Sequence, residues 1–283
     1  MSHVTLAQRF YLGAVAVLAL WVGIWCYFVP AMSDLGIPWL LPPLCATFLG
    51  AMYLSGAVFT ATCMGARRWT DIRVVMPMIA MWTGGLTLIS LLYLPAFNFA
   101  RMQVLIWFGA YIVYPLIALG LMWTHRRQNG IHPWDEPALP QWVRLYLLVQ
   151  GSVMVVLALG LLFLPRTMAM LWPWQTGLLM LQLYAAPLLS YGIGSFSLRR
   201  QHTWSEIRLA LMAMSVFTGT ELAASLRYHS FLNGPALSIA LWFAWLAVTT
   251  AMLGLLSFMA FRRETALERA RRLARWHWQT HGE

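Results

Sequence analysis

Lysine is absent from this chain of 283 residues, and charged side chains of any kind are scarce. Charged residues make up 10% of the sequence, whereas soluble domains carry about 25%. Hydrophobic residues make up 60%, and the mean hydropathy is +0.66. This composition excludes an ordinary soluble enzyme, a disordered chain and a collagen-like repeat. The class that remains is a polytopic membrane protein.

Residues that carry catalysis or bind metals are also few. The three cysteines all fall inside apolar segments, and we interpret them as small buried residues. The seven histidines lie in the connections, the tails or the span ends, which argues against haem ligation. The sequence contains no metal-ligand spacing, nucleophile elbow or phosphate-binding loop. We therefore predict no catalytic residue, no metal site and no cofactor.

Long apolar runs dominate the chain instead. A helix needs about 20 apolar residues to cross a hydrocarbon core of about 30 Å, and lipid-exposed backbone must satisfy its own hydrogen bonds. The predicted fold class is therefore an all-α integral membrane protein with eight transmembrane helices. The predicted spans are 10–29, 42–64, 74–94, 103–123, 145–164, 177–198, 209–229 and 237–259.

Arginine placement predicts the orientation of these spans. With eight spans, 16 of the 19 arginines share one side with both termini, and only Arg101, Arg166 and Arg227 lie on the other. Cytoplasmic loops of membrane proteins carry the excess of basic residues. We expect a protein of the bacterial inner membrane with both termini in the cytoplasm.

The sequence also repeats itself after 135 residues without a gap. The segment from Trp69 to Arg73 matches the segment from Trp204 to Arg208, and Asn98 matches Asn233. Because each copy holds four spans, the two copies are predicted to be parallel, related by a pseudo-twofold axis along the membrane normal. The predicted organisation is a first four-helix repeat (1–127), a proline-rich cytoplasmic linker (128–141), a second repeat (142–262) and an arginine-rich tail (263–283).

Two features of these copies are interpreted as membrane anchors. The repeated Pro-Trp pairs that open the second span of each copy, with Trp39 and Trp174, suit the outer headgroup zone. The tail is predicted to be an amphipathic helix along the inner surface, and a solvated tail is the alternative. Nucleic-acid binding is not expected. Lipid headgroups would contact Arg269, Arg271, Arg272 and Arg275.

Polar residues in the third span of each copy share one helical face. Their spacing of seven and then three residues brings them to the same side of an α-helix. Such a face on two related helices predicts a polar site between the repeats, near the middle of the membrane. The residues are Thr83, Ser90 and Tyr93 in the first copy and Thr218, Ser225 and Tyr228 in the second.

Glu221 adds a carboxyl group to this face in the second copy only, where the first copy has Leu86. It lies 13 residues beyond Arg208, or about 20 Å into the membrane. An acid at that depth is costly, so we expect it to be protonated or paired, for example with Arg227 or Tyr228. It marks a functional site or, alternatively, forms one interhelical hydrogen bond.

Each copy resembles the DoxX-like four-helix membrane families of bacteria. The resemblance rests on the first span "RFYLGAVAVLALWVGIWCYFVP", the segment "FLGAMYLSG" and the basic turn "ARRWTDIR". It implies a bacterial inner-membrane protein, with some family members placed beside respiratory or quinol-oxidising complexes. It implies no catalytic residues.

Two functions follow from these features. The first is a small permease in which Glu221 binds a cation or a proton, or orients a polar solute. The second is a non-catalytic accessory subunit of a larger membrane complex, because one acid in eight spans is few for a pump. Expected partners are membrane lipids, with other membrane subunits or a second copy as alternatives. A lipid-modifying enzyme is disfavoured, because the polar residues of the outer face, such as Asp34 and His229, are scattered.

Overall fold

The computed structural model of the chain describes residues 4–66, 69–125 and 138–281, with side chains everywhere except at 70, 125 and 264–281. Eight helices in these ranges are long and apolar enough to cross a membrane, which indicates a polytopic membrane protein. They are α1 (Leu6–Phe28), α2 (Pro43–Met64), α4 (Val75–Leu92), α5 (Met102–His125), α6 (Gln141–Phe163), α8 (Leu178–Arg199), α9 (Trp204–Arg227) and α10 (Ala236–His281).

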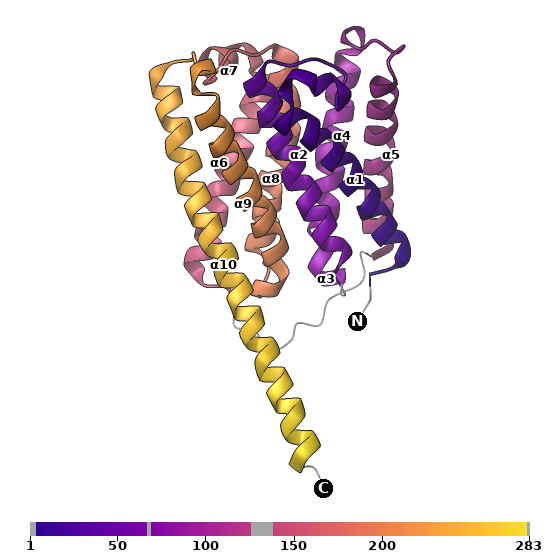
Figure 1. Ribbon diagram of the computed structural model, residues 1–283, viewed down its shortest axis with the longest axis vertical. Helices are drawn as coiled ribbons and strands as arrows, with labels where there is room; N and C mark the ends of the chain where they lie inside the picture. Colours follow the sequence, from indigo (N-terminus) through magenta and orange to yellow (C-terminus); the bar gives the residue numbers. More distant parts are fainter. Residues whose placement is uncertain (1–3, 67–68, 126–137, 282–283) are drawn as a thin grey trace.

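Shorter helical segments lie at the two ends of the bundle. The segment α3 lies at the same end as the N-terminal residues and the projecting part of α10, and α7 lies at the opposite end (Figure 1). An even number of spans requires both termini to share an end, as they do here. The short segments are η1 (Pro30–Leu35), α3 (Trp69–Ile72), η2 (Leu94–Ala96), α7 (Pro165–Leu171) and η3 (His229–Phe231).

Because of their capping residues, two of the spans begin earlier in the sequence than hydropathy predicts. The Thr5 N–H donates to the Gln8 side chain at 2.8 Å and the Thr5 hydroxyl accepts from the Gln8 N–H, so α1 starts at Leu6 rather than at residue 10. Thr203 and Glu206 form the same capping box, which moves the start of α9 from residue 209 to Trp204. Of the other six spans, α6 also starts four residues early, at Gln141, and the remaining five begin within one residue of their predicted starts.

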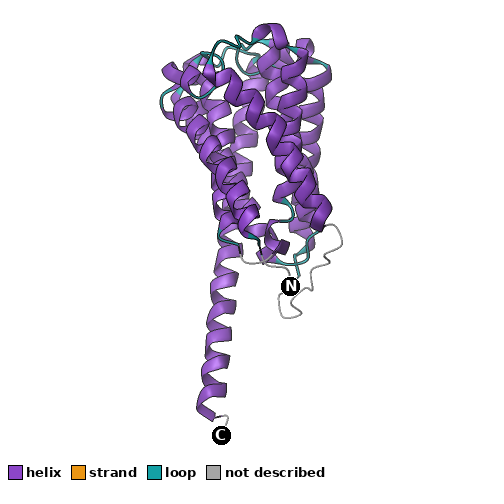
Figure 2. Ribbon diagram, turned by 90° about the vertical axis from the view of Figure 1, so that its right-hand side faces the viewer, coloured by secondary structure: helices purple, strands orange, loops and turns teal. Residues whose placement is uncertain are grey.

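The C-terminal tail differs most from its prediction. Instead of a separate helix along the membrane surface, the structure has one continuous helix, α10, that extends away from the bundle (Figures 1 and 2). The reason lies in composition: residues 255–281 contain no glycine or proline and are rich in alanine, leucine, glutamate and arginine, which all favour helix. The side chains of the four arginines predicted to contact lipid lie outside the described residues, as does most of the linker.

The long helices pack in two rows of four. One row runs α1, α2, α9 and α10, and the other runs α5, α4, α8 and α6 (Figure 1). The contacts within each row join the first two spans of one half to the last two spans of the other half. The core of the molecule therefore lies along α2, α4, α8 and α9, and α2 and α8 are the most buried spans.

Equivalent hydrogen bonds join the halves at positions 135 residues apart. In one row the Ser55 hydroxyl on α2 donates to the Ala213 carbonyl on α9 at 2.6 Å. In the other row the Ser190 hydroxyl on α8 donates to the Met78 carbonyl on α4 at 2.8 Å. Ser55 also bonds the Tyr191 hydroxyl, and this bond has no counterpart because the residue equivalent to Tyr191 is Gly56.

Glycine allows the closest approach between helices within a row. A Cβ atom at Gly50 would lie 2.6 Å from the Tyr27 backbone nitrogen, so α2 and α1 touch backbone to backbone at this point. A Cβ atom at Gly192 would lie 3.0 Å from the Gly151 carbonyl oxygen, which marks the corresponding contact of α8 with α6. Small residues at such crossings are the usual means of packing helices in lipid.

Candidate functional site

The predicted polar residues form two separate clusters rather than one continuous surface. α4 packs on α8 and α9 packs on α2, so α2 and α8 lie between the two helices that carry these residues. Among the described contacts, the serine and threonine hydroxyls on each face bond within their own half of the chain. In both halves the serine accepts from a tryptophan on the following span: Trp107 Nε1 to Ser90 and Trp242 Nε1 to Ser225, each at 2.9 Å.

The remaining members of the predicted set have structural partners. The Thr83 and Thr218 hydroxyls donate to carbonyls one turn back on their own helices, at 2.6 and 3.4 Å. The Tyr93 hydroxyl donates to the Gln182 side chain on α8 at 2.5 Å. Tyr228 ends α9, and the Arg227 guanidinium lies over its ring at 5.3 Å.

Glu221 is the exception, because half of its carboxyl group has no partner. The residue is 0% exposed, and six residues separate it from the end of α9, or about 9 Å along the helix axis. Its Oε1 atom accepts from the Ser225 hydroxyl at 3.1 Å, and its Oε2 atom has no hydrogen-bond partner. The ion pairs found among the described residues, Arg73–Glu206 and Arg101–Asp34, do not involve it.

Glu221 lies where the two halves of the chain meet. Tyr27 on α1, from the first half, donates to the Thr220 carbonyl at 2.8 Å, next to Glu221 in the chain. Tyr27 and Tyr184 on α8 are both within electrostatic range of the Glu221 carboxyl group. Tyr93, through its bond to Gln182, also lies between the halves, whereas the bonds of Ser90 and Ser225 stay within their own halves.

Aromatic rings surround this end of α9. Phe48, from α2, lies in the middle of them, with its centroid 4.6 Å from Tyr184 and 5.3 Å from Trp174. Phe217 lies one turn before Glu221 on α9, and Ser225 bonds both Glu221 and Trp242. We call this set the aromatic cluster; its members are Phe48, Trp172, Trp174, Tyr184, Phe217 and Trp242.

Three further polar groups in or beside the cluster are buried without a hydrogen bond. They are the indole N–H groups of Trp172 and Trp174 and the hydroxyl of Thr176. The Trp174 and Thr176 groups lie near the sulfur of Cys45 but outside hydrogen-bond geometry. Buried polar atoms are almost always paired in proteins, so several unpaired atoms in one region make it the candidate place for a bound water or ligand.

Trp174 also corrects the interpretation of the Pro-Trp pairs as headgroup anchors. Its side chain is 2% exposed and packs inside the aromatic cluster, while its counterpart Trp39 is half-buried. The two tryptophans contact equivalent rings, at 5.2 Å from Trp174 to Trp242 and 5.5 Å from Trp39 to Trp107. A tryptophan near a span end has the same sequence signature whether it meets lipid or a neighbouring helix.

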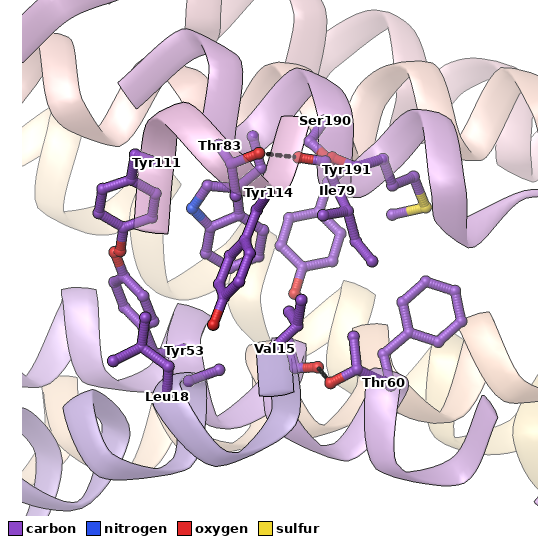
Figure 3. Close-up of a pocket in the computed structure, with 15 residues that line it drawn as sticks. Val15, Leu18, Tyr53, Thr60, Ile79, Thr83, Tyr111, Tyr114, Ser190 and Tyr191 are labelled. Carbon is purple, nitrogen blue, oxygen red and sulfur yellow. Dashed lines mark hydrogen bonds between the residues drawn. The ribbon is translucent and has the colours of Figure 1, made fainter. Parts of the chain in front are cut away.

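A second place of interest is a small cavity between α1, α2, α4, α5 and α8 (Figure 3). It has a volume of about 60 Å³, and Thr83 is among its lining residues, together with Tyr53, Tyr111, Tyr114 and Tyr191. The Tyr53 and Tyr111 hydroxyls bond each other, and the ring faces leave the lining almost wholly apolar. Apolar voids of this kind stay dry, so the cavity is a packing space and not a polar site.

Sequence reasoning found Glu221 but missed the aromatic cluster. Phe48 carries no polar signal and comes from the other half of the chain, so only the packing of α2 on α9 brings it there. The segment "LWPWQT" before α8 was the available signal, since it contains two tryptophans and a threonine of this region. Within the described residues, no group of three metal-ligating side chains comes together.

Comparison with known proteins identifies no relative of this chain. No protein-family model, curated protein or solved structure matches the chain.

Proposed function

We propose that the chain consists of two parallel four-helix repeats, as the sequence predicts, and that their last two spans are exchanged between the rows. The equivalent hydrogen bonds of Ser55 and Ser190, and of Trp107 and Trp242, support a pseudo-twofold relation. The packing within the rows supports it as well, because the contact of α2 with α9 in one row is equivalent to the contact of α8 with α4 in the other. The axis would run between α2 and α8.

We propose further that the protein is a small permease in which Glu221 takes up and releases a cation or a proton. The observation that carries this proposal is the unpartnered Oε2 atom of a fully buried carboxyl group, next to the Tyr27–Thr220 contact between the two halves. Intramembrane acids are costly and mark ion or proton pathways. A relative shift of the halves would change the surroundings of Glu221, which is the requirement for alternating access.

Flux into liposomes tests this function. Purified protein is reconstituted, a potential with a negative interior is imposed, and uptake is followed for protons with an internal pH dye and for radiolabelled rubidium and methylammonium. We expect uptake of at least one probe above that of empty liposomes, and its loss in Glu221→Gln. Glu206→Gln, the same change at the far end of α9, serves as the matched control and keeps the flux. Uptake that is equal in wild type, Glu221→Gln and empty liposomes would overturn the proposal.

We propose that the membrane is the bacterial inner membrane and that both termini are cytoplasmic. The bundle end that bears the N-terminus, α3 and the tail carries Arg9, Arg73 and Arg144 among the described residues, which fits the positive-inside rule (Figure 1). Reporter fusions that fluoresce only in the cytoplasm test this directly. Fluorescence from a C-terminal fusion, and none from a fusion after residue 235, is the expected result.

The alternative, an accessory subunit, is favoured by one observation. α10 extends past the bundle by 18 residues beyond Arg263, or about 27 Å of helix, which offers a cytoplasmic contact for another protein. A membrane complex of the kind that the DoxX-like resemblance implies would be such a partner. Purification in mild detergent separates the two functions, because an accessory subunit co-purifies with its complex and a permease is obtained alone or as copies of itself.

A further inference from the structure

The Glu221 carboxyl group is unsatisfied in either protonation state. As a carboxylate it is a buried negative charge with one hydrogen bond, from Ser225, and no basic side chain beside it among the described residues. As a carboxylic acid it is neutral, and a proton on Oε1 can bond the Ser225 hydroxyl, but the Oε2 atom still has no partner. A proton alone therefore does not complete this site, whereas a cation beside Oε2 supplies the missing charge and contact.

The surroundings of Glu221 suit an organic cation better than a metal ion. Metal ions such as Na⁺, Mg²⁺ and Ca²⁺ require several oxygen ligands. The other unpaired groups of the region, at Trp172 and Trp174, are N–H donors and cannot ligate a metal. The faces of indole and phenyl rings attract cations within about 6 Å of the ring centroid, and tryptophan is the strongest of them.

The aromatic cluster supplies several such rings. Trp174 and Trp242 lie 5.2 Å apart, and Phe48 lies 5.6 Å from Trp242. Ser225 links the Trp242 indole to the Glu221 carboxyl group through two hydrogen bonds of 2.9 and 3.1 Å. The carboxyl group is therefore linked through Ser225 to the edge of the aromatic cluster, and an acid beside aromatic rings combines the two kinds of group that attract an organic ammonium ion.

The first half of the chain serves as an internal comparison. It keeps the scaffold, since Trp107 bonds Ser90 and contacts Trp39 as their counterparts do. It lacks the two residues that give the second half its chemistry: Leu86 replaces Glu221, and the position equivalent to Phe48 in the other row is Leu183. Both leucines are fully buried. The fold itself therefore does not require a carboxyl group or a phenyl ring at these places.

We propose that Glu221 and the aromatic cluster bind a small organic ammonium ion, such as a methylated amine. This inference rests on the proposed permease function and names its substrate class. Phe48, at the centre of the cluster, must move when a cation enters beside Glu221. Because Phe48 belongs to α2 and Glu221 to α9, binding is thereby coupled to the contact between the halves.

Tryptophan fluorescence and thermal stability test the proposal on the purified full-length protein. The probe is tetramethylammonium chloride, titrated against sodium chloride at equal ionic strength. We expect a saturable change in fluorescence and a rise in melting temperature with tetramethylammonium only. Glu221→Gln should weaken the apparent affinity by about thirtyfold or more, as expected for loss of one partner of a buried charge pair. Glu221→Asp keeps the charge and should retain part of the affinity.

Trp107→Phe is the matched control, because it removes the equivalent indole–serine bond in the half that lacks the acid. It should leave tetramethylammonium binding unchanged, whereas Trp242→Phe should weaken it. The proposal is overturned if sodium gives the same response, or if correctly folded Glu221→Gln binds as wild type does. If tetramethylammonium does not bind while proton or rubidium flux still depends on Glu221, the substrate class is wrong and the permease function stands. If neither is observed, both are wrong.

Discussion

Removal of the two equivalent serine hydroxyls should destabilise the protein by unequal amounts. Ser190→Ala removes one hydrogen bond, to the Met78 carbonyl. Ser55→Ala removes two, to the Ala213 carbonyl and to the Tyr191 hydroxyl, which is buried and has no other partner described. The near symmetry of the two sites makes each variant the control for the other, since helix type, burial and the size of the change are the same.

The magnitudes follow from known hydrogen-bond energies. Interhelical hydrogen bonds in membrane proteins contribute about 0.6 kcal/mol on average, so Ser190→Ala should cost about 0.6 kcal/mol. Ser55→Ala loses two bonds and leaves a buried hydroxyl unsatisfied, at a further cost of about 1 kcal/mol or more, for a total of about 2 kcal/mol. Adding Tyr191→Phe to Ser55→Ala removes that hydroxyl and should restore about 1 kcal/mol.

The assay is the free energy of unfolding from titration with sodium dodecyl sulfate in mixed micelles, followed by circular dichroism and by tryptophan fluorescence. Equal losses in Ser55→Ala and Ser190→Ala would refute the reasoning, because they would show that the Tyr191 bond contributes nothing. Failure of Tyr191→Phe to restore stability in the double variant would contradict the assignment of the extra loss to an unsatisfied hydroxyl.

Three other perturbations have expected outcomes. Gly50→Ala should lower the melting temperature sharply, because its Cβ would lie 2.6 Å from the Tyr27 backbone, whereas Gly84→Ala, whose nearest neighbour would be at 3.6 Å, should be close to neutral. The three cysteine thiols are buried, so a maleimide should label none of them in the folded protein and all of them in dodecyl sulfate; labelling of the folded protein would contradict the packing. Arg101→Ala breaks a half-exposed ion pair with Asp34 and should cost less than about 1 kcal/mol, with a smaller effect at high salt; a larger, salt-independent loss would show that the bonds of Arg101 to backbone carbonyls dominate.

The number and type of the helices were predictable because their signal is local. Apolar length identifies each span within its own 20 residues, and the register of the repeat can be read by aligning the chain with itself. The early starts of α1 and α9 were predictable in principle, since Thr5 with Gln8 and Thr203 with Glu206 are visible capping boxes. A hydropathy profile alone does not reveal these capping boxes.

The pairing of helices was not predictable, and the site depends on it. Repetition places Trp107 beside Ser90 and Trp242 beside Ser225, but it does not say that the second span of one half packs on the third span of the other. Phe48 therefore reaches Phe217, one turn before Glu221, through a contact between residues far apart in the chain. Helical period predicts one polar face on α4, but the Thr83 hydroxyl bonds its own helix and the Tyr93 hydroxyl bonds Gln182 on α8.

Each row combines the first two spans of one half with the last two spans of the other half. The order in which the spans are synthesised therefore also sets the order of assembly. α4 is complete about 100 residues before its partner α8 has been synthesised. At about 5–20 residues per second, the first half waits roughly 5–20 s in the membrane with its inner faces unmatched by its own chain. During that time, lipid or the insertion machinery must cover the surface around Ser55 and Met78. Two first halves that meet in this interval can also pair with each other, since in the proposed repeat the spans that each one lacks are the counterparts of those that the other carries.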